Sequence, residues 1–479
     1  MSLILRIIRV GLLGALALSD SACFARYATP AHLEDSPANL IIRIDSIVEH
    51  ARREFHLAGV SLVVMRGQDV LVSKGYGLAN INARTPATDR TVYAVGSLSK
   101  QITAAAIMKL VEDGRVQLDA PVAAYLPELA VARDNSLRVR TLLRQTSGLA
   151  SFDDYPEVDA LGLGPDSTMF PFQRVVAMIG AHAPLYRPDT WWSYSNANYT
   201  LLAAIIERVT GLTYDEYLSR ALFQPLGMTE TRSCSPTVRN ERARAVGYEI
   251  DGDSLVMRRT RDYLVPSMTG PGGLCSSMVE LAKWTRALVD RKAVSPASYR
   301  AITSVQPVDA GVYGTLTPPY GFGISLLPFA GQPAVWHTGV REGFMSVLAF
   351  LPQQDIIIAA ATNTRHTLID ELALRVVREI LAIPETQSLD LRPSAEEASR
   401  TVGSYDDAMF KLRVFEESGH LSVEVPELGV REPLLYQGRH LFVSAGARRL
   451  RFQFDAVLGP AQRVDWEWSE LRAYGKRTR

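Results

Sequence analysis

The chain has 479 residues, of which 51 are basic and 51 acidic, so its formal net charge at pH 7 is zero. A balanced charge without a long basic run gives no electrostatic reason to bind nucleic acid or an anionic membrane surface. The sequence also lacks Gly-x-x-x-x-Gly-Lys, His-Glu-x-x-His and Gly-x-Ser-x-Gly, which leaves a phosphate loop, a common zinc-protease site and an α/β-hydrolase serine elbow without support.

Residues 1–25 have the pattern of an export signal: two arginines, an apolar run over 10–18 and a small-residue cleavage site at 23–25. The apolar run is too short for a membrane span, and no other stretch is long enough. We therefore expect an exported protein, periplasmic or secreted, without a membrane span. Lipid anchoring at Cys23 is less favoured, because Asp20 stands where a lipoprotein signal has an aliphatic side chain.

The first elements of the mature chain are a helix and a strand pair. Apolar residues recur with helical spacing over 39–55. Residues 60–65 and 70–72 then read as two strands joined by the turn Arg66-Gly67-Gln68-Asp69.

Ser97 and Lys100 follow, three positions apart, at the start of the apolar stretch 104–110. On a helix this spacing places a hydroxyl and an amine on one face. A serine attacks well at neutral pH only when a neighbouring base takes its proton, and burial lowers the pKa of a lysine toward that role. The alternative is an ordinary amphipathic helix with a capping serine and a surface lysine, and the pair alone does not decide.

Residues 115–310 are predicted to be mostly helical with long loops. A polar aromatic loop, Tyr194-Ser195-Asn196, precedes an apolar helix, and Ser277-Met-Val-Glu280 looks like a capping box opening a helix through residue 287. Cys234 and Cys275 form either a disulfide or two buried thiols, and neither has metal-site spacing.

Strand-like runs return at 320–326, 334–336, 346–351 and 356–361, and helical spacing resumes over 368–383. The sequence His337-Thr338-Gly339 ends the second run. Helices before and after a broken set of strands predict an α+β fold, an antiparallel sheet flanked by terminal helices with an inserted helical region. The site is then expected in the cleft between sheet and helical region.

The C-terminal part changes character. We expect a first domain over 38–383, a linker over 384–399 and a small antiparallel β domain, barrel-like, over 400–479. Short alternating strands carry this prediction, for example 412–414, 421–425, 450–454 and 464–468. His420 and His440 are expected on the surface or in turns rather than as metal ligands.

Together these motifs resemble the serine β-lactamase and penicillin-binding-protein superfamily, in its class C or β-lactamase-related branch. The resemblance covers residues 40–382 and includes Ser97-x-x-Lys100, Tyr194-x-Asn196 and His337-Thr338-Gly339. Further segments are similar to the family: Lys109–Pro127, Leu142–Leu149, Phe223–Met228 and Gly270–Leu274.

The resemblance implies a catalytic set with Ser97 as the acylated nucleophile and Lys100 as its base or proton partner. Tyr194 would act with Lys100 as the second residue of the general base. It implies that Asn196 binds the substrate carbonyl and that the backbone N–H groups of Ser97 and Val340 form the oxyanion hole. Substrate-binding positions are then Asn196, His337, Thr338, Gly339 and Val340.

His337 stands where the family usually has lysine, so it is a poorer partner for a substrate carboxylate. Arg341 offers a replacement charge, and specificity otherwise depends on Trp191, Trp192 or the loop around Phe152. The resulting hypothesis is an exported serine hydrolase, without metal or cofactor, acting on a small-molecule or peptide substrate. It cleaves a β-lactam, a D-amino-acid amide or peptide, or an ester. The alternative is a penicillin-binding or sensor protein that does not turn over.

Overall fold

The computed structural model describes residues 37–478 with internal gaps. Left out are 134, 153–154, 156, 158–170, 235–242, 252–253, 258–267, 306–318, 366–368, 385–390, 407–410, 418, 427–429, 446–449, 457–458 and 469–470. The expected export signal and Cys23 lie outside the described residues. No helix in the described part of the chain is long and apolar enough to cross a membrane.

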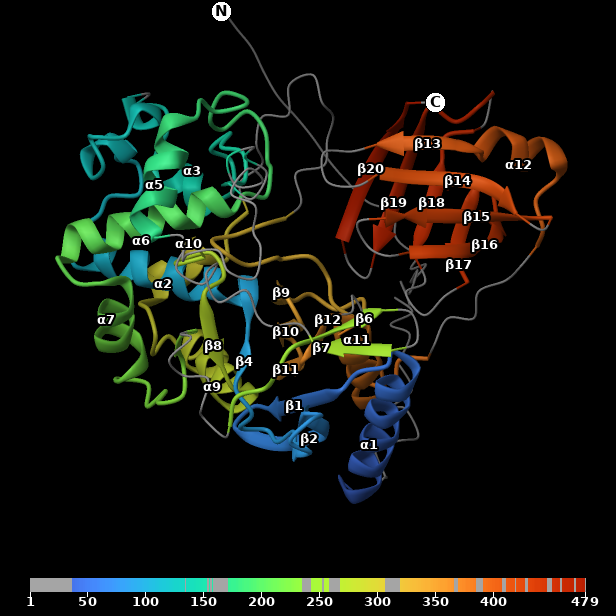
Figure 1. The fold of residues 1–479 in the computed structure, drawn as a ribbon, viewed down its shortest axis with the longest axis horizontal. Coiled ribbons are helices and arrows are strands. Elements are labelled where there is room, and N and C mark those ends of the chain that lie inside the picture. The colour runs from blue at the N-terminus through green and yellow to red at the C-terminus, as the bar shows by residue number, and fades with distance from the viewer. Residues whose placement is uncertain are drawn as a thin grey trace, which may run out of the picture.

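A six-stranded antiparallel sheet forms the centre of the N-terminal body, with the strand order β3-β2-β1-β11-β10-β9 (Figure 1). Its strands are β1 (Gly59–Arg66), β2 (Asp69–Asn80), β3 (Thr85–Pro86), β9 (Val335–Arg341), β10 (Phe344–Leu351) and β11 (Ile356–Thr362). The order brings the N-terminal strand β1 beside the late strand β11, so the sheet unites both ends of the predicted hydrolase segment.

Both faces of this sheet are covered, because successive side chains of a strand point to opposite faces. On β11, Ile356 and Ile358 pack with helices α1 (Pro37–Glu54) and α11 (Ile369–Ile380). Ile357 packs in the other core cluster, on the side of helix α9 (Met278–Val289). The strands are therefore apolar on both faces rather than alternating, and the predicted α+β fold with terminal helices is confirmed.

A helical region packs beside the sheet. It contains α2 (Ser99–Glu112), α3 (Val139–Leu143), α5 (Phe172–Ala181), α6 (Asn196–Thr210), α7 (Tyr214–Leu218) and α10 (Pro296–Ile302). Short helical turns lie at Gly96–Leu98, Val122–Ala124, Ala130–Arg133 and Ser219–Phe223. Helix α2 is buried along nearly its whole length, so it is a core helix and not the surface amphipathic helix considered as an alternative.

Two small sheets join these parts. One has the order β4-β8-β5, with β4 (Tyr93–Ala94), β8 (Leu274–Ser276) and β5 (Arg232–Ser233). The other has the order β12-β6-β7, with β12 (Thr364–Arg365), β6 (Tyr248–Asp251) and β7 (Ser254–Met257). The first sheet matters for function because β4 leads directly into the turn that carries Ser97.

The C-terminal part is a closed eight-stranded barrel (Figure 1). Its strands are β13 (Gly403–Asp406), β14 (Lys411–Glu417), β15 (His420–Val425), β16 (Val430–Gly438), β17 (Leu441–Ser444), β18 (Arg451–Phe454), β19 (Arg463–Trp468) and β20 (Leu471–Arg477). Buried aromatic side chains, among them Tyr405, Phe442 and Phe452, fill its core. The barrel expected from the alternating pattern is confirmed.

Two local expectations differ from the structure. Residues 320–326 form no strand, because Gly323 adopts φ +72° and turns the chain against helix α2. A Cβ at Gly323 would lie 2.7 Å from the backbone carbonyl carbon of Lys100, so no side chain fits there. In addition, helix α12 (Ala395–Thr401) begins inside the segment 384–399 that was expected to be a linker.

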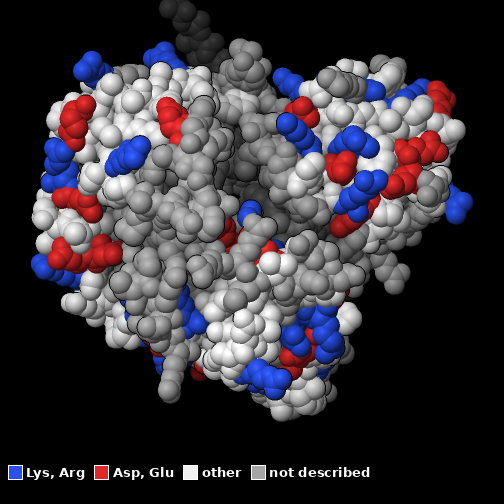
Figure 2. All heavy atoms as spheres, in the orientation of Figure 1, with Lys and Arg blue, Asp and Glu red and all other residues white. Residues whose placement is uncertain are grey.

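Charged side chains of both signs are interspersed on the face shown in Figure 2. This agrees with the zero net charge of the sequence.

Candidate active site

Ser97 lies in the short turn Gly96–Leu98, between strand β4 and helix α2, and its side chain is half-buried. Gly96 has φ +53°, and a Cβ there would lie 2.6 Å from the backbone nitrogen of Val340. A Cβ on Gly339 would lie 2.0 Å from the carbonyl oxygen of Val95. The two glycines thus allow the nucleophile turn and the edge strand β9 to touch backbone to backbone.

Lys100 is fully buried, and oxygen atoms of Ser97, Asn196 and Pro271 lie within hydrogen-bond distance of its amine. Its Nζ lies 3.0 Å from Ser97 Oγ, 2.8 Å from Asn196 Oδ1 and 3.0 Å from the carbonyl oxygen of Pro271. The amide and carbonyl oxygens can only accept hydrogen bonds, so each takes an N–H of the amine. In the neutral amine these two bonds use both hydrogens and direct the lone pair toward the hydroxyl of Ser97. The geometry therefore suits removal of the serine proton.

Tyr194 also reaches this group. The Lys100 Nζ lies 4.6 Å from the centroid of the Tyr194 ring, and the same ring lies 6.1 Å from that of His337. Asn196 is the first residue of helix α6, and Tyr194 lies two positions before it in the preceding loop. The structure thus brings Ser97, Lys100, Tyr194, Asn196 and His337 together, although they come from three separate stretches of the chain.

The loop carrying Tyr194 is held by Gln145, a residue that sequence reasoning did not single out. The Gln145 side-chain oxygen accepts hydrogen bonds from the backbone N–H of Ser195 at 3.1 Å and from Asn198 Nδ2 at 2.5 Å. Its backbone carbonyl accepts from the N–H of Ser193 at 3.0 Å. Gln145 is fully buried and has φ +65°, an uncommon conformation for a residue with a side chain. It fixes the loop from both sides of Tyr194.

His337 is buried on strand β9, between Tyr320 and the backbone of the next residue. Its Nε2 lies 3.0 Å from the hydroxyl of Tyr320, and its Nδ1 lies 2.5 Å from the carbonyl oxygen of Thr338. Burial is the larger cause that lowers the pKa of His337 to about 4, and the Lys100 amine adds to it only in its protonated form. The side chain is therefore neutral at pH 7, which makes it a weaker partner for a carboxylate than an ordinary histidine.

Thr338, Gly339 and Val340 continue strand β9 past His337. Val340 is 45% exposed, and its backbone nitrogen lies beside Gly96, the residue before Ser97. Arg341 is half-buried at the end of the strand, and Trp191 and Trp192 are half-buried in the loop before Tyr194. Phe152 is 3% exposed and packs in the hydrophobic core. Its side chain is thus a core residue.

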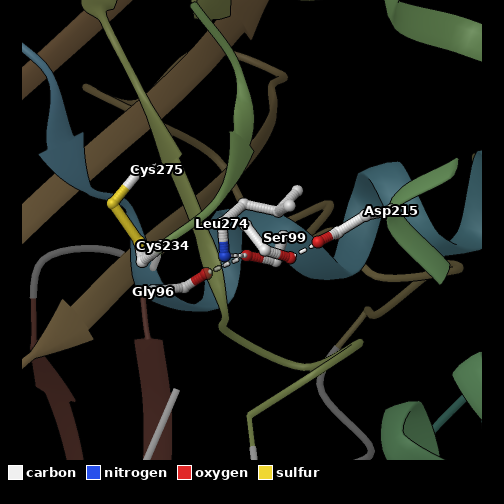
Figure 3. Close-up of a disulfide and its surroundings, with 7 residues drawn as sticks. Gly96, Ser99, Asp215, Cys234, Leu274 and Cys275 are labelled. Carbon is white, nitrogen blue, oxygen red and sulfur yellow. Dashed lines mark hydrogen bonds between the residues drawn. A yellow bond between two sulfur atoms is a disulfide. The ribbon is translucent and has the colours of Figure 1, made fainter. Parts of the chain in front are cut away.

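The open question about the two cysteines is resolved by a disulfide between Cys234 and Cys275 (Figure 3). Cys275 lies on β8, next to Leu274, whose backbone N–H donates to Ser99 Oγ at 3.2 Å. Ser99 Oγ in turn donates to the carbonyl oxygen of Gly96 at 2.7 Å. The disulfide-bearing strand is thus hydrogen-bonded to the turn that holds Ser97. In the described part of the chain, no cluster of His, Cys, Asp or Glu could hold a metal ion.

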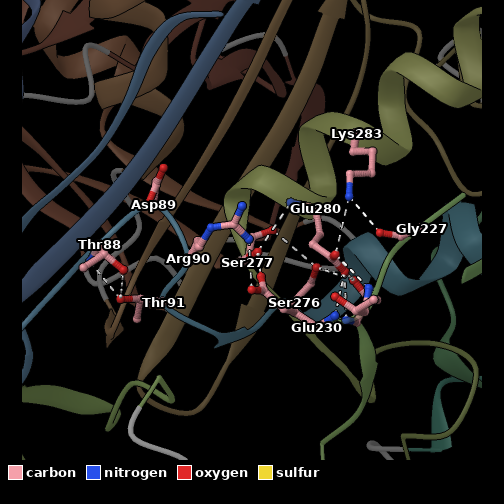
Figure 4. Close-up of polar contacts among 12 residues, drawn as sticks. Thr88, Asp89, Arg90, Thr91, Gly227, Glu230, Ser276, Ser277, Glu280 and Lys283 are labelled. Atoms are coloured by element: carbon pink, nitrogen blue, oxygen red, sulfur yellow. Dashed lines mark hydrogen bonds and ion pairs between the residues drawn. The ribbon is translucent and has the colours of Figure 1, made fainter.

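Helix α9 begins at the predicted residue but without the complete capping box. The Ser277 side chain accepts from the N–H of Glu280, as expected. The Glu280 carboxylate, however, accepts hydrogen bonds from the backbone N–H groups of Thr229, Glu230 and Thr231 (Figure 4). This buried carboxylate therefore holds the segment that leads into β5 and Cys234.

Comparison with known proteins places this geometry in a family. A family profile described as Beta-lactamase matches residues 44–382. Protein flp of Staphylococcus aureus strain N315 is 27% identical over 344 residues, 70% of this chain and 66% of flp. The chain thus spans slightly less than two thirds of the length of this curated relative.

Solved structures share the fold. The octameric penicillin-binding protein homologue from Pyrococcus abyssi covers 91% of this chain and 100% of its own, with 25% identity and a TM-score of 0.66. The D-amino acid amidase from Ochrobactrum anthropi SV3, in complex with L-phenylalanine amide, covers 71% of this chain and 98% of its own, with 24% identity and a TM-score of 0.61. With a profile match over most of its length and the predicted motifs meeting at one serine, the chain belongs to the beta-lactamase family, within the β-lactamase and penicillin-binding-protein superfamily of serine hydrolases.

Proposed function

We propose that the protein is a hydrolase that works through an acyl-enzyme on Ser97. The observation that carries this proposal is the buried Lys100 amine, 3.0 Å from Ser97 Oγ, with its other two hydrogen bonds made to Asn196 and Pro271. Burial disfavours the charged form of a lysine, and a neutral amine in this orientation accepts a proton. A serine beside such a base is an activated nucleophile.

The reaction has two stages. As Ser97 Oγ attacks the substrate carbonyl, its proton moves to the Lys100 amine, and the phenol of Tyr194 relays a proton to the leaving group. The backbone N–H groups of Ser97 and Val340 stabilise the oxyanion, a contribution of about 3 kcal/mol for one such donor in other enzymes. Water then attacks the acyl carbonyl with the same groups in reversed roles, which releases the acid and restores the Ser97 hydroxyl.

The substrates that we propose are amides, β-lactams or esters of small molecules or peptides. The neutral His337 favours acyl donors whose recognition does not need a cation at this position. The amidase that shares the fold was solved with an amino acid amide, which makes D- and L-amino acid amides the first substrates to test. We also propose that the protein is exported, on the pattern of residues 1–25, and that it is organised as hydrolase domain, linker and barrel.

The proposal is tested with Ser97→Ala and a fluorophosphonate or fluorescent penicillin probe. Wild type should be labelled, with the adduct on the peptide that contains Ser97. Ser97→Ala should lose the label, and its kcat should fall by roughly 10⁴ or more. Ser399→Ala, an exposed serine on helix α12, serves as the matched control and should behave as wild type.

Turnover by Ser97→Ala at the wild-type rate would refute the acyl-enzyme. Stoichiometric labelling of wild type without steady-state hydrolysis of esters, β-lactams and amino acid amides would instead support a penicillin-binding or sensor protein with the same fold.

A further inference from the structure

Tyr320 is part of an aromatic group around His337 that the sequence motifs do not include. The Tyr320 ring centroid lies 5.8 Å from that of His337, 6.5 Å from that of Tyr194 and 5.6 Å from that of Trp192. Its ring is 8% exposed, and its hydroxyl lies 3.0 Å from His337 Nε2. Tyr320 thus lies between the loop of Tyr194 and His337-Thr338-Gly339, which is the third of the three sequence motifs.

The two hydrogen bonds of His337 determine where its proton lies. The carbonyl oxygen of Thr338 can only accept, so His337 Nδ1 carries the hydrogen in that 2.5 Å contact. A neutral imidazole has one N–H, and its second nitrogen is then an acceptor. The Tyr320 hydroxyl therefore donates to Nε2. Both nitrogens of His337 are occupied, and neither presents an N–H to a substrate.

We propose that Tyr320 is a positioning residue that holds His337 as the neutral, Nδ1-protonated tautomer, so that the third motif presents no cation to the acyl donor. This inference deepens the proposed function and, in its consequence for substrates, depends on it. A family member with lysine at this position has a fixed positive charge there. In this chain the position holds a neutral histidine whose two nitrogens are both hydrogen-bonded, one of them to the buried phenol of Tyr320. The site therefore disfavours acyl donors that carry a carboxylate.

The electrostatic surroundings act in the same direction. Among the described residues, the charged or titratable groups that these contacts place near His337 are Lys100 on helix α2, Tyr194 in the loop before α6, and Tyr320. Burial lowers the pKa of His337 most, and Lys100 lowers it further whenever its amine is protonated, since a second positive charge there is unfavourable. Burial also raises the pKa of Tyr320 well above its ordinary value, which keeps the phenol protonated as a donor.

The tautomer is measured directly by NMR on the full-length protein labelled with ¹⁵N-histidine, with His337→Gln assigning the signal. Wild type should show a protonated Nδ1 and an unprotonated Nε2, without titration between pH 5 and 8. In Tyr320→Phe, which loses one hydrogen bond to the neutral form, the pKa of His337 should rise by about one unit. Tyr405→Phe removes a buried tyrosine hydroxyl in the barrel and should leave the His337 signal unchanged.

A His337 that titrates near its ordinary pKa in wild type, or carries its proton on Nε2, overturns the proposal. So does an unchanged signal in Tyr320→Phe. The wild-type spectrum alone decides the tautomer, so the test does not depend on the folding of the variant. Because it needs no turnover, it also stands if Ser97 proves not to be acylated.

The consequence for substrates is tested with two matched esters, 4-nitrophenyl butyrate and 4-nitrophenyl hemisuccinate, after subtraction of the Ser97→Ala rate. Wild type should prefer the uncharged butyrate in kcat/KM by about tenfold or more, which corresponds to about 1.4 kcal/mol. His337→Lys should reduce this preference. Equal hydrolysis of the two esters by wild type overturns the exclusion of carboxylates. If wild type hydrolyses neither ester and no amino acid amide, the proposed function is refuted. The role of Tyr320 is then decided by the NMR result alone.

Discussion

The surroundings of Ser97 and the core of the C-terminal barrel bury different kinds of side chain. Around Ser97 the chain buries an amine, amides and an imidazole, including Lys100, Gln145, Asn198 and His337. The barrel core contains mainly aromatic and aliphatic side chains, such as Phe442, Phe452 and Phe454. Burial of polar groups costs free energy unless each is hydrogen-bonded, whereas burial of aromatic rings stabilises the fold. We therefore expect the polar surroundings of Ser97 to serve the proposed chemistry at a cost in stability, and the barrel core to contribute stability.

If this contrast is right, the largest effect on activity comes from Lys100. Lys100→Ala removes the proposed base and takes the hydrogen bonds of its amine away from Asn196 Oδ1 and the Pro271 carbonyl. We expect kcat/KM to fall roughly 10³-fold, the size of a general-base contribution. The rate of hydrolysis of a 4-nitrophenyl ester measures it.

Lys109→Ala is the matched control, because Lys109 lies on the same helix but pairs with Glu112 near the surface. It should keep kcat/KM within about twofold of wild type, since a surface ion pair is worth at most about 1 kcal/mol. Equal losses in the two variants would mean that helix α2, and not the amine at residue 100, supports activity.

In the barrel the same kind of truncation should change stability and leave chemistry intact. Phe452 is fully buried and stacks with Trp466 at a centroid distance of 6.3 Å. Phe452→Ala should lower the free energy of unfolding by about 3–5 kcal/mol. Denaturant unfolding followed by circular dichroism measures this loss, and kcat/KM at low temperature should stay near the wild-type value.

Arg451→Ala, at the exposed neighbouring position, should change the free energy of unfolding by less than about 0.5 kcal/mol. A loss of acyl-enzyme formation in folded Phe452→Ala would show that the barrel takes part in the chemistry. It would contradict the expectation that the barrel contributes stability alone.

The smallest effect tests buried polar groups that serve structure alone. Glu280 is 2% exposed and accepts three backbone N–H groups and the Thr231 hydroxyl. Glu280→Gln replaces one accepting oxygen by a nitrogen that cannot accept, so we expect a loss of about 2 kcal/mol in the free energy of unfolding. Thermal denaturation measures it.

The nearby Lys283→Ala serves as its control, because the Lys283 amine lies 3.8 Å from the Glu280 carboxylate on the solvent side and should contribute less than about 1 kcal/mol. If Glu280→Gln is as stable as wild type, the segment 229–231 is held by something other than this carboxylate.

Local patterns predicted the parts of the site that are close in sequence. Ser97 and Lys100 could be identified because three positions suffice to set their geometry, and the helices and strands around them follow from apolar spacing. Residues 320–326 were wrongly predicted as a strand, because Tyr-Gly-Phe-Gly-Ile alternates as a strand does. The positive φ of Gly323 instead forms a turn against Lys100.

The motifs of the resemblance predicted distant residues of the site, but contacts made by residues outside those motifs could not be predicted from the sequence. Tyr320 carries no motif, and its hydrogen bond to His337 depends on how that turn meets strand β9. Gln145 holds the loop of Tyr194 from a left-handed backbone conformation, which a glutamine in the sequence does not indicate. The pairing of Cys234 with Cys275 depends on β8 lying beside β5, 41 positions apart in the chain. The neutral state of His337 at pH 7 follows mainly from its burial in the folded chain, which its residue type alone does not indicate.

Closure of the barrel by pairing of β13 with β20 has a consequence for recognition. An open sheet offers unpaired N–H and C=O groups along its outer strands, to which an extended peptide can add as a further strand. A closed ladder has no such outer strand. The described strands of this barrel therefore offer their side chains, rather than an unpaired strand, to a molecule that would bind there.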